Sequence, residues 1–156
     1  MYKWFSIAAL IIVVDQITKY VASSMLIMHE PVAVLPFFNF TLMHNTGAAF
    51  SFLADQGGWQ RWFFAVLALA VSIVLALWLR RLQAHEKWLA LSLSLVLGGA
   101  AGNLIDRVYY GYVIDFIDIY YNSMHWPAFN IADSAITVGA VMLVIDTFRS
   151  KSKSAH

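Results

Sequence analysis

The stretch from residue 62 to residue 79, WFFAVLALAVSIVLALWL, decides the fold class of this chain. It runs for eighteen residues without a charged side chain. As a helix it would be about 27 Å long, at roughly 1.5 Å per residue, which is close to the ~30 Å hydrocarbon core of a bilayer. Trp62 and Trp78 lie near its two ends, where interfacial aromatic side chains are common. We therefore expect a membrane-spanning helix here.

The composition of the whole chain agrees with a membrane protein. Its 156 residues make at most one domain. Of these residues 61% are hydrophobic and 12% are charged, whereas soluble domains carry about 25% charged residues. The net charge of +1, on dispersed basic residues, argues against nucleic-acid binding. The absence of cysteine excludes a disulfide framework, a thiolate metal site and a cysteine nucleophile.

Three further stretches complete a set of four predicted spanning helices. They cover residues 4–23, 88–105 and 132–148. Residues 1–14 could instead be a signal peptide, but no small-residue cleavage site follows them. Gly98 and Gly102 are four residues apart, a spacing that lets two membrane helices pack closely. We expect a single integral membrane domain over residues 1–156.

The basic residues predict the orientation of the helices. Seven would lie on one side of the membrane: Lys3, Arg80, Arg81, Lys87, Arg149, Lys151 and Lys153. Three would lie on the other: Lys19, Arg61 and Arg107. Because basic loops tend to stay in the cytoplasm, we expect both termini and the 80–87 loop to be cytoplasmic. Residues 24–60 and 106–133 then lie outside.

The first outer segment, at about residues 31–56, does not have a helical pattern. It is rich in β-branched and aromatic residues, and Pro31 and Pro36 would break a helix. We expect a small, bent sheet on the outer membrane surface.

A possible flap follows within the same outer segment. Gly47, Gly57 and Gly58 flank the apolar run Ala48–Leu53. Such a run should not stay exposed to water, so we expect it to cover a site or to contact the acyl chains of a substrate.

Polar side chains gather near the predicted outer ends of the helices. Ionisable groups near a bilayer are expensive and therefore indicate function. The set comprises Asp15, Asn45, Asn103, Asp106, Arg107, Asp115, Asp118, Asn130 and Asp133. The predicted cytoplasmic side adds only Asp146 to its solvated loop charges. This uneven distribution favours a site at one depth, near the outer interface.

Two helical pairs in this set have more than one interpretation. Asp15 and Lys19 are four residues apart in the order that favours an ion pair. Either Lys19 extends outward from a local pair, or Asp15 turns inward to hold a neighbouring element. Asn103 and Arg107 also share a helical face. That face could serve helix-end hydrogen bonding and headgroup contact, or it could support a site.

Asp115 and Asp133 both lie in apolar surroundings on the same predicted side. Asp133, with Asn130, could simply cap the last helix, and Asp115 could be an exposed strand residue. Alternatively, two such carboxylates could share one proton, as in aspartic proteases, where one activates water and the other donates to a carbonyl. The sequence has no zinc-binding histidine spacing, serine-nucleophile motif or phosphate loop. We therefore expect no metal and no cofactor.

Five blocks of sequence carry a family resemblance. They are DQ at 15–16, NTGAAF at 45–50, GNLIDR at 102–107, VIDF at 113–116 and FNIADS at 129–134. In this order, with four spans and this length, the chain resembles the bacterial lipoprotein signal peptidases (signal peptidase II). The resemblance covers essentially the whole chain, and the blocks are specific as a set.

The resemblance implies an intramembrane aspartyl endopeptidase of the bacterial inner membrane. Such enzymes remove the signal peptide from prolipoproteins whose lipobox cysteine carries a diacylglyceryl group. It implies that Asp115 and Asp133 are catalytic and that the site faces the periplasm. The implied substrate-binding or supporting residues are Asp15, Asn45, Asn103, Arg107 and Asn130. It also implies four helices with a small extracytoplasmic β-cradle. The implied partners of the protein are diacylated prolipoproteins and membrane lipid. We expect a monomer.

A small proton- or cation-coupled transporter is the main alternative. Four short helices with Asp15 and a group of carboxylates would suit one. Against it, the charges gather at one face instead of lining a path across the bilayer. A scaffold without catalysis is a second alternative, but interior carboxylates would then lower stability with no gain.

Overall fold

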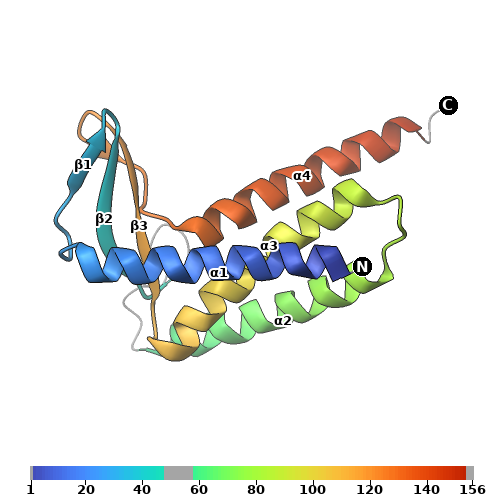
Figure 1. The fold of residues 1–156 in the computed structure, drawn as a ribbon, viewed down its shortest axis with the longest axis horizontal. Coiled ribbons are helices and arrows are strands. Elements are labelled where there is room, and N and C mark those ends of the chain that lie inside the picture. Colours follow the sequence, from blue (N-terminus) through green and yellow to red (C-terminus); the bar gives the residue numbers. More distant parts are fainter. Residues whose placement is uncertain (1, 48–57, 154–156) are drawn as a thin grey trace.

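Helices make up most of the molecule, with a small sheet at one end. The structure, a computed structural model, describes residues 2–47 and 58–153, with side chains as far as residue 148. The described helices are α1 (Tyr2–Met25), α2 (Trp59–Arg81), α3 (Lys87–Tyr109) and α4 (Ile131–Lys153). The described strands are β1 (Val32–Leu35), β2 (Phe38–Asn45), β3 (Val113–Tyr121) and β4 (Met124–His125). Figure 1 shows the sheet at one end of the helices and both termini at the other.

Within the described residues, four helices are long and apolar enough to cross a membrane. The expected fold class, four spanning helices with a small sheet, is therefore confirmed. The helices are longer than the apolar runs that predicted them: α2 begins at Trp59 rather than at residue 62. An apolar run marks only the hydrocarbon core, whereas the hydrogen-bonded helix continues into the interface.

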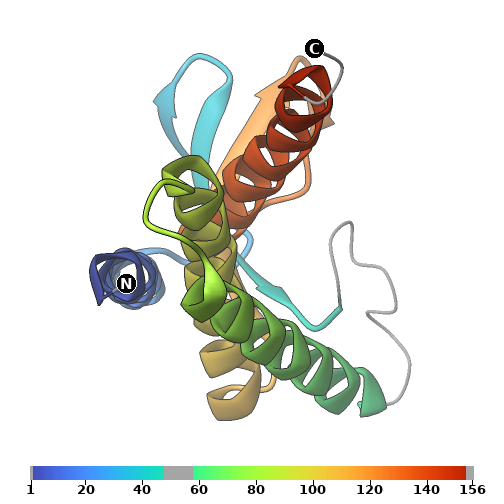
Figure 2. The same ribbon diagram turned by 90° about the vertical axis from the view of Figure 1, so that its right-hand side faces the viewer.

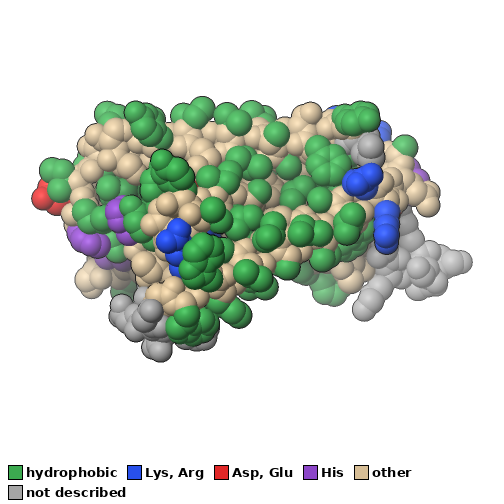
Figure 3. Space-filling model, turned by 90° about the horizontal axis from the view of Figure 1, so that it is seen from below, with side chains coloured by type: hydrophobic (Ala, Val, Ile, Leu, Met, Phe, Trp, Pro, Cys, Tyr) green, Lys and Arg blue, Asp and Glu red, His purple; other side chains and the backbone are tan. Residues whose placement is uncertain are grey.

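The helices expose apolar side chains along most of their length. In α2, Val66 and Val74 are 63% and 61% exposed, which would be unfavourable in water but suits contact with acyl chains. Figure 3 shows hydrophobic side chains along the whole length of one face, with lysine and arginine side chains toward its ends.

The central helix is α3, which packs against each of the other three helices (Figure 2). A Cβ atom on Gly98 would lie 2.8 Å from the carbonyl oxygen of Ala8 in α1. A Cβ atom on Gly99 would clash with the carbonyl oxygen of Ala132 in α4. Glycine therefore allows α1 and α4 to approach α3 on two sides. The four-residue spacing of Gly98 and Gly102 predicted close packing of α3 against one other helix.

The sheet is antiparallel, with the strand order β1-β2-β3-β4. Only β1 and β2 come from the outer segment expected to form it. The strands β3 and β4 come from the second outer segment, and β3 pairs with β2 so that Asp115 lies opposite Met43. The local sequence pattern does not indicate this pairing, because it joins segments about 70 residues apart. The expected flap over Ala48–Leu53 lies outside the described residues.

Candidate active site

Asp115 and Asp133 come together from two elements at the sheet end of the helices. Asp115 lies on β3 and is 2% exposed. Asp133 lies in the first turn of α4 and is half-buried. Neither carboxylate has an ion-pair partner among the described residues.

The start of α4 is a capping box, formed by Asn130 and Asp133. The backbone N–H of Asp133 donates to Asn130 Oδ1 at 2.9 Å, and the backbone N–H of Asn130 donates to Asp133 Oδ2 at 3.3 Å. The other carboxylate oxygen of Asp133 accepts a hydrogen bond from Asn103 Nδ2 at 2.7 Å. Asp133 therefore caps the helix as the simplest interpretation predicted, and the cap holds its carboxylate in one orientation beside Asn103.

Amide groups surround the carboxylate of Asp115. Asn130 Nδ2 donates to Asp115 Oδ1 at 2.7 Å, and Asn45 Nδ2 donates to Asp115 Oδ2 at 3.1 Å. Asn130 Nδ2 also lies 3.3 Å from Asn103 Oδ1. The side chain of Asn130 thus contacts one carboxylate while its backbone contacts the other. Four of the residues expected at the site, with Asp133, form one hydrogen-bonded group.

Burial changes the acidity of Asp115. Burial first, and then repulsion by Asp133, raises the pKa of Asp115 from 3.8 to about 7. Hydrogen bonds from Asn45 and Asn130 and the positive charge of Lys19 act in the opposite direction and do not cancel the rise. A carboxyl group with this pKa is substantially protonated at neutral pH, so it can donate a proton.

A second buried cluster lies behind the first. Lys19 is 1% exposed, and its Nζ lies 2.8 Å from both Asp15 Oδ2 and Asp106 Oδ2. It also donates to Asn103 Oδ1 at 2.9 Å. The interpretation in which Lys19 extends outward is therefore wrong, and Asp15 turns inward. The lysine points inward because three oxygen acceptors from α1 and α3 replace the water it would otherwise bind.

This second cluster holds the two segments that carry the candidate catalytic residues. Asp15 Oδ1 accepts from the backbone N–H of Ala132 in α4, at 2.9 Å. Asp106 Oδ2 accepts from the backbone N–H of Ile114 in β3, at 3.2 Å. Sequence analysis gave no site role to Lys19, Asp106 or Gln16, whose Nε2 lies 2.8 Å from Asp106 Oδ1. For Asp106 the sequence does offer a signal: its three-residue spacing from Asn103 places both side chains on one helical face.

Arg107 contacts the segment after β2. Its Nη2 donates to the carbonyl oxygen of Gly47 at 3.1 Å, and its guanidinium lies 5.4 Å from the ring centre of Phe64. Arg61 donates from Nε to the carbonyl oxygen of Arg107 at 2.8 Å and from Nη2 to that of Val108 at 2.7 Å. Arg107 and Asn103 are both close to the site, but they bond to different parts of it: Arg107 to Gly47 and Asn103 to Asp133. In α3 it is Asp106 that bonds to the backbone of β3.

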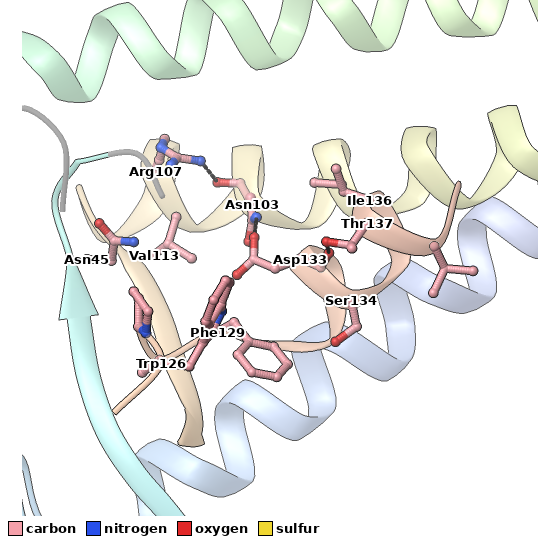
Figure 4. Close-up of a pocket in the computed structure, with 13 residues that line it drawn as sticks. Asn45, Asn103, Arg107, Val113, Trp126, Phe129, Asp133, Ser134, Ile136 and Thr137 are labelled. Carbon is pink, nitrogen blue, oxygen red and sulfur yellow. Dashed lines mark hydrogen bonds between the residues drawn. The ribbon is translucent and has the colours of Figure 1, made fainter. Parts of the chain in front are cut away.

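A cavity of about 490 Å³ opens beside Asp133. Its polar lining includes Asn45, Asn103, Arg107 and Asp133, and its apolar lining includes Phe129, Ile136 and Val138. Figure 4 shows Asp133 and Asn103 pointing toward each other, with Phe129 and Trp126 nearby. In the part of the chain that the structure describes, no three histidine, aspartate or glutamate side chains could together hold a metal ion.

Comparison with known proteins identifies relatives over nearly the whole chain. A family model described as signal peptidase (SPase) II matches residues 7–149. The lipoprotein signal peptidase of Teredinibacter turnerae is 58% identical over 146 residues, which cover 93% of this chain and 86% of that protein. The lipoprotein signal peptidase of Pseudomonas fluorescens is 57% identical over 150 residues, covering 95% of this chain and 88% of that one.

Solved structures show the same fold. One, described as a bacterial membrane enzyme, superposes with a TM-score of 0.88 at 31% sequence identity and covers 98% of this chain and 92% of that chain. A second with the same description has a TM-score of 0.84 at 30% identity and covers 94% and 93%.

Proposed function

The chain belongs to the signal peptidase II family, and we propose that Asp115 and Asp133 are the pair with which it hydrolyses its substrates. Its function is the removal of signal peptides from lipoproteins. Membership of a peptidase family argues against the transporter alternative. The observation that carries the aspartyl mechanism is the contact of Asn130 with both carboxylates, beside a cavity that Asp133 lines. Neither carboxylate has an ion-pair partner among the described residues.

In this mechanism Asp133 is ionised and Asp115 is protonated. The carboxylate of Asp133 is stabilised by Asn103 Nδ2, by a backbone N–H and by the positive end of the α4 dipole. Asp115 carries the proton because burial and the charge of Asp133 raise its pKa to about 7. Like-charged neighbours that cannot both ionise share a single proton, and the pair titrates together.

The chemical steps then follow from these two protonation states. Asp133 removes a proton from water, the water oxygen attacks the carbonyl carbon of the cleaved bond, and Asp115 donates its proton to the carbonyl oxygen. Asp133 next passes its proton to the amide nitrogen, and Asp115 takes back a proton from the tetrahedral intermediate as the C–N bond breaks. The released products are a carboxylic acid and an amine, and the pair returns to its starting state.

The position of the cavity supports the proposed substrate class. Its lining continues onto Ile136 and Val138, which lie within the spanning helix α4. An apolar signal segment and acyl chains fit this part of the site. We therefore propose that the cleaved bond precedes a diacylglyceryl-modified cysteine, and that the surrounding membrane lipid supplies the rest of the environment. A monomer suffices in this proposal, because all the residues used come from one chain.

We propose that the sheet end faces the periplasm. The four spans and the family indicate a protein of the bacterial inner membrane. The start of α1 with Lys3, the end of α2 with Arg80 and Arg81, and the start of α3 with Lys87 lie at the end away from the sheet (Figure 1). Reporter fusions at residue 84 and at residue 122 should report opposite sides, with residue 84 in the cytoplasm. Fusions that report the same side would overturn this orientation.

The decisive experiment is cleavage of a diacylglyceryl-modified precursor peptide by the purified protein in detergent. Asp133→Asn should remain folded, because Asn130 is the N-cap of α4 and the asparagine oxygen can still accept one of the two hydrogen bonds that Asp133 accepts. It should lower the cleavage rate by about 10³-fold or more, because it removes the base that activates water. Asp146→Asn, at a half-buried carboxylate farther along α4, is the matched control. A folded Asp133→Asn protein that cleaves at the normal rate would end the aspartyl mechanism.

A further inference from the structure

A second cavity adjoins the first. It has a volume of about 550 Å³, and Thr41, Met43, Asp118 and His125 lie in its wall. The two cavities share three consecutive lining residues, Trp126–Ala128. A single extended segment of chain is therefore the boundary between the candidate catalytic cavity and a second one of similar size.

The chain on either side of Ala128 is hydrogen-bonded to β3. It runs beside β3: the N–H of Trp126 donates to the carbonyl oxygen of Ile119 at 2.7 Å, and that of Phe129 to Ile117 at 3.1 Å. Between them, the backbone of Ala128 takes part in no hydrogen bond with any residue that the structure describes. The N–H groups of Trp126 and Phe129 are three residues apart and both point toward β3, so the segment departs from regular strand alternation at Pro127 and Ala128. The backbone groups of Ala128 are therefore available to an extended peptide.

The two cavities also lie at different depths. The first extends along α4 to Ile136 and Val138, inside a spanning helix. The second is formed by the sheet and the loop before α4, outside the described spans. A lipoprotein precursor needs both environments, because its signal segment is apolar and the polypeptide that follows the cleaved bond is not.

We propose that the second cavity binds the first residues of the mature lipoprotein, which cross from the catalytic cavity along Trp126–Ala128 in an extended conformation. The proposal rests on the proposed peptidase function and assigns a binding site to the substrate residues that are C-terminal to the cleaved bond. It predicts that kcat/KM depends on the residues that follow the modified cysteine.

The charge of the second cavity determines which residues it accepts. Asp118 is 5% exposed, and its carboxylate accepts hydrogen bonds from Thr41 Oγ1 at 3.0 Å, Asn39 Nδ2 at 3.3 Å and His125 Nδ1 at 2.8 Å. Burial alone would raise the pKa of Asp118, but the bonds from His125, Thr41 and Asn39 hold it below its usual value. His29 and His125 also line this cavity. At a pH where histidine is ordinarily neutral, the wall therefore carries the negative charge of Asp118, which disfavours an acidic side chain and favours a basic one.

The first test compares precursor peptides that carry lysine or glutamate at the second, third or fourth residue after the cleaved bond. At pH 8, where histidine is ordinarily neutral, kcat/KM should favour lysine at one of these positions by about fivefold or more. Asp118→Asn should bring this ratio close to one. The ratio does not depend on how much of a variant is folded. Glu30→Gln is the matched control. Glu30 is an exposed acid that does not line the cavity, although its neighbour His29 does. A wild-type ratio near one at all three positions overturns the proposal.

The second test measures position without requiring turnover. Asp133→Asn protein is irradiated with the diacylglyceryl-modified peptide carrying a benzophenone side chain at the same positions. Adducts on Met43, His125 or Trp126 support the proposal. Adducts confined to residues 136–138 of α4, or to lipid, overturn it. If the wild-type protein cleaves none of the peptides but the adducts form in the second cavity, the peptidase mechanism fails while the binding site stands.

Discussion

Two pairs of carboxylates lie at the sheet end of the helices, and they differ in the groups that lie between them. Asp15 and Asp106 share the ammonium group of Lys19, at 2.8 Å from each. Asp115 and Asp133 share only the amide and backbone groups of Asn130. A cation between two carboxylates attracts both and makes them a fixed support. Neutral amides do not compensate the repulsion between Asp115 and Asp133. A carboxyl group whose ionisation is opposed in this way is suited to proton transfer.

Asn103 connects the two pairs. Its Oδ1 accepts from Lys19 and from Asn130, while its Nδ2 donates to Asp133. The support pair also orients the backbone of both segments that carry the reactive pair, through Ala132 and Ile114. The comparison therefore predicts that substitutions in one pair affect mainly activity, and that substitutions in the other affect mainly folding.

The largest expected effect is on activity. Asp115→Asn keeps the size of the side chain but cannot donate the proton that the mechanism requires, so cleavage should fall by about 10³–10⁴-fold. The variant should remain folded, with an apparent Tm in detergent no lower than that of the wild-type protein, because a repelled buried carboxyl group is replaced by a neutral amide. Assays of cleavage and thermal unfolding on one preparation check both statements. Loss of folding together with activity would contradict the division between the pairs.

The next effect is on stability. Lys19→Met leaves Asp15 and Asp106 buried without a cation, which should lower the free energy of unfolding by about 3–5 kcal/mol. Folded yield in detergent and unfolding in a denaturant series measure this change. Lys87→Met removes an exposed lysine from α3 and should change little.

A compensating variant sharpens this prediction. Adding Asp15→Asn and Asp106→Asn to Lys19→Met removes the uncompensated charges, so part of the lost stability should return. If Lys19→Met is as stable as Lys87→Met, the support role of the lysine is wrong.

The dependence of stability on pH should come next in size. The pKa of Asp115 is about 7 in the folded protein against an ordinary value of 3.8, so the folded state binds its proton more tightly than the unfolded state. The resulting contribution is fully present below pH 3.8 and is lost as the pH rises to about 7. Its upper limit is roughly 1.4 kcal/mol per pKa unit. The apparent Tm of the wild-type protein should therefore fall across this window more steeply than that of Asp115→Asn, and parallel curves would argue against the raised pKa.

The smallest effect should come from the residue that the two pairs share. Asn103→Asp keeps the acceptor for Lys19 but removes the donor to Asp133, so cleavage should fall by about 10–100-fold, as for loss of one hydrogen bond to a charged group. Stability should change less than in Lys19→Met. Asn103→Ala removes both interactions and should lower both quantities. A cleavage rate in Asn103→Asp equal to that of the wild-type protein would show that the donor to Asp133 is dispensable.

Much of the fold could be predicted because its signals are local. The run from residue 62 to residue 79 matches the thickness of a bilayer whatever surrounds it. The residues of the candidate site could be collected for a similar reason: Asp115 and Asp133 are carboxylates within apolar sequence, and such groups are rare without a role. Their catalytic function remains a proposal, but their proximity is a property of the structure.

The sequence by itself determined a membrane protein with four spans, a sheet segment and a set of polar residues at one depth, because each of these depends on neighbouring residues and on the bilayer. Only the tertiary structure decided which polar residues meet. Asp15 binds the backbone of Ala132, 117 residues away, and Asn45 binds Asp115, 70 residues away. The direction of Lys19 depended on acceptors from another helix. Local spacing contains no information about such partners, because burial and pairing are set by the packing of whole helices against one another.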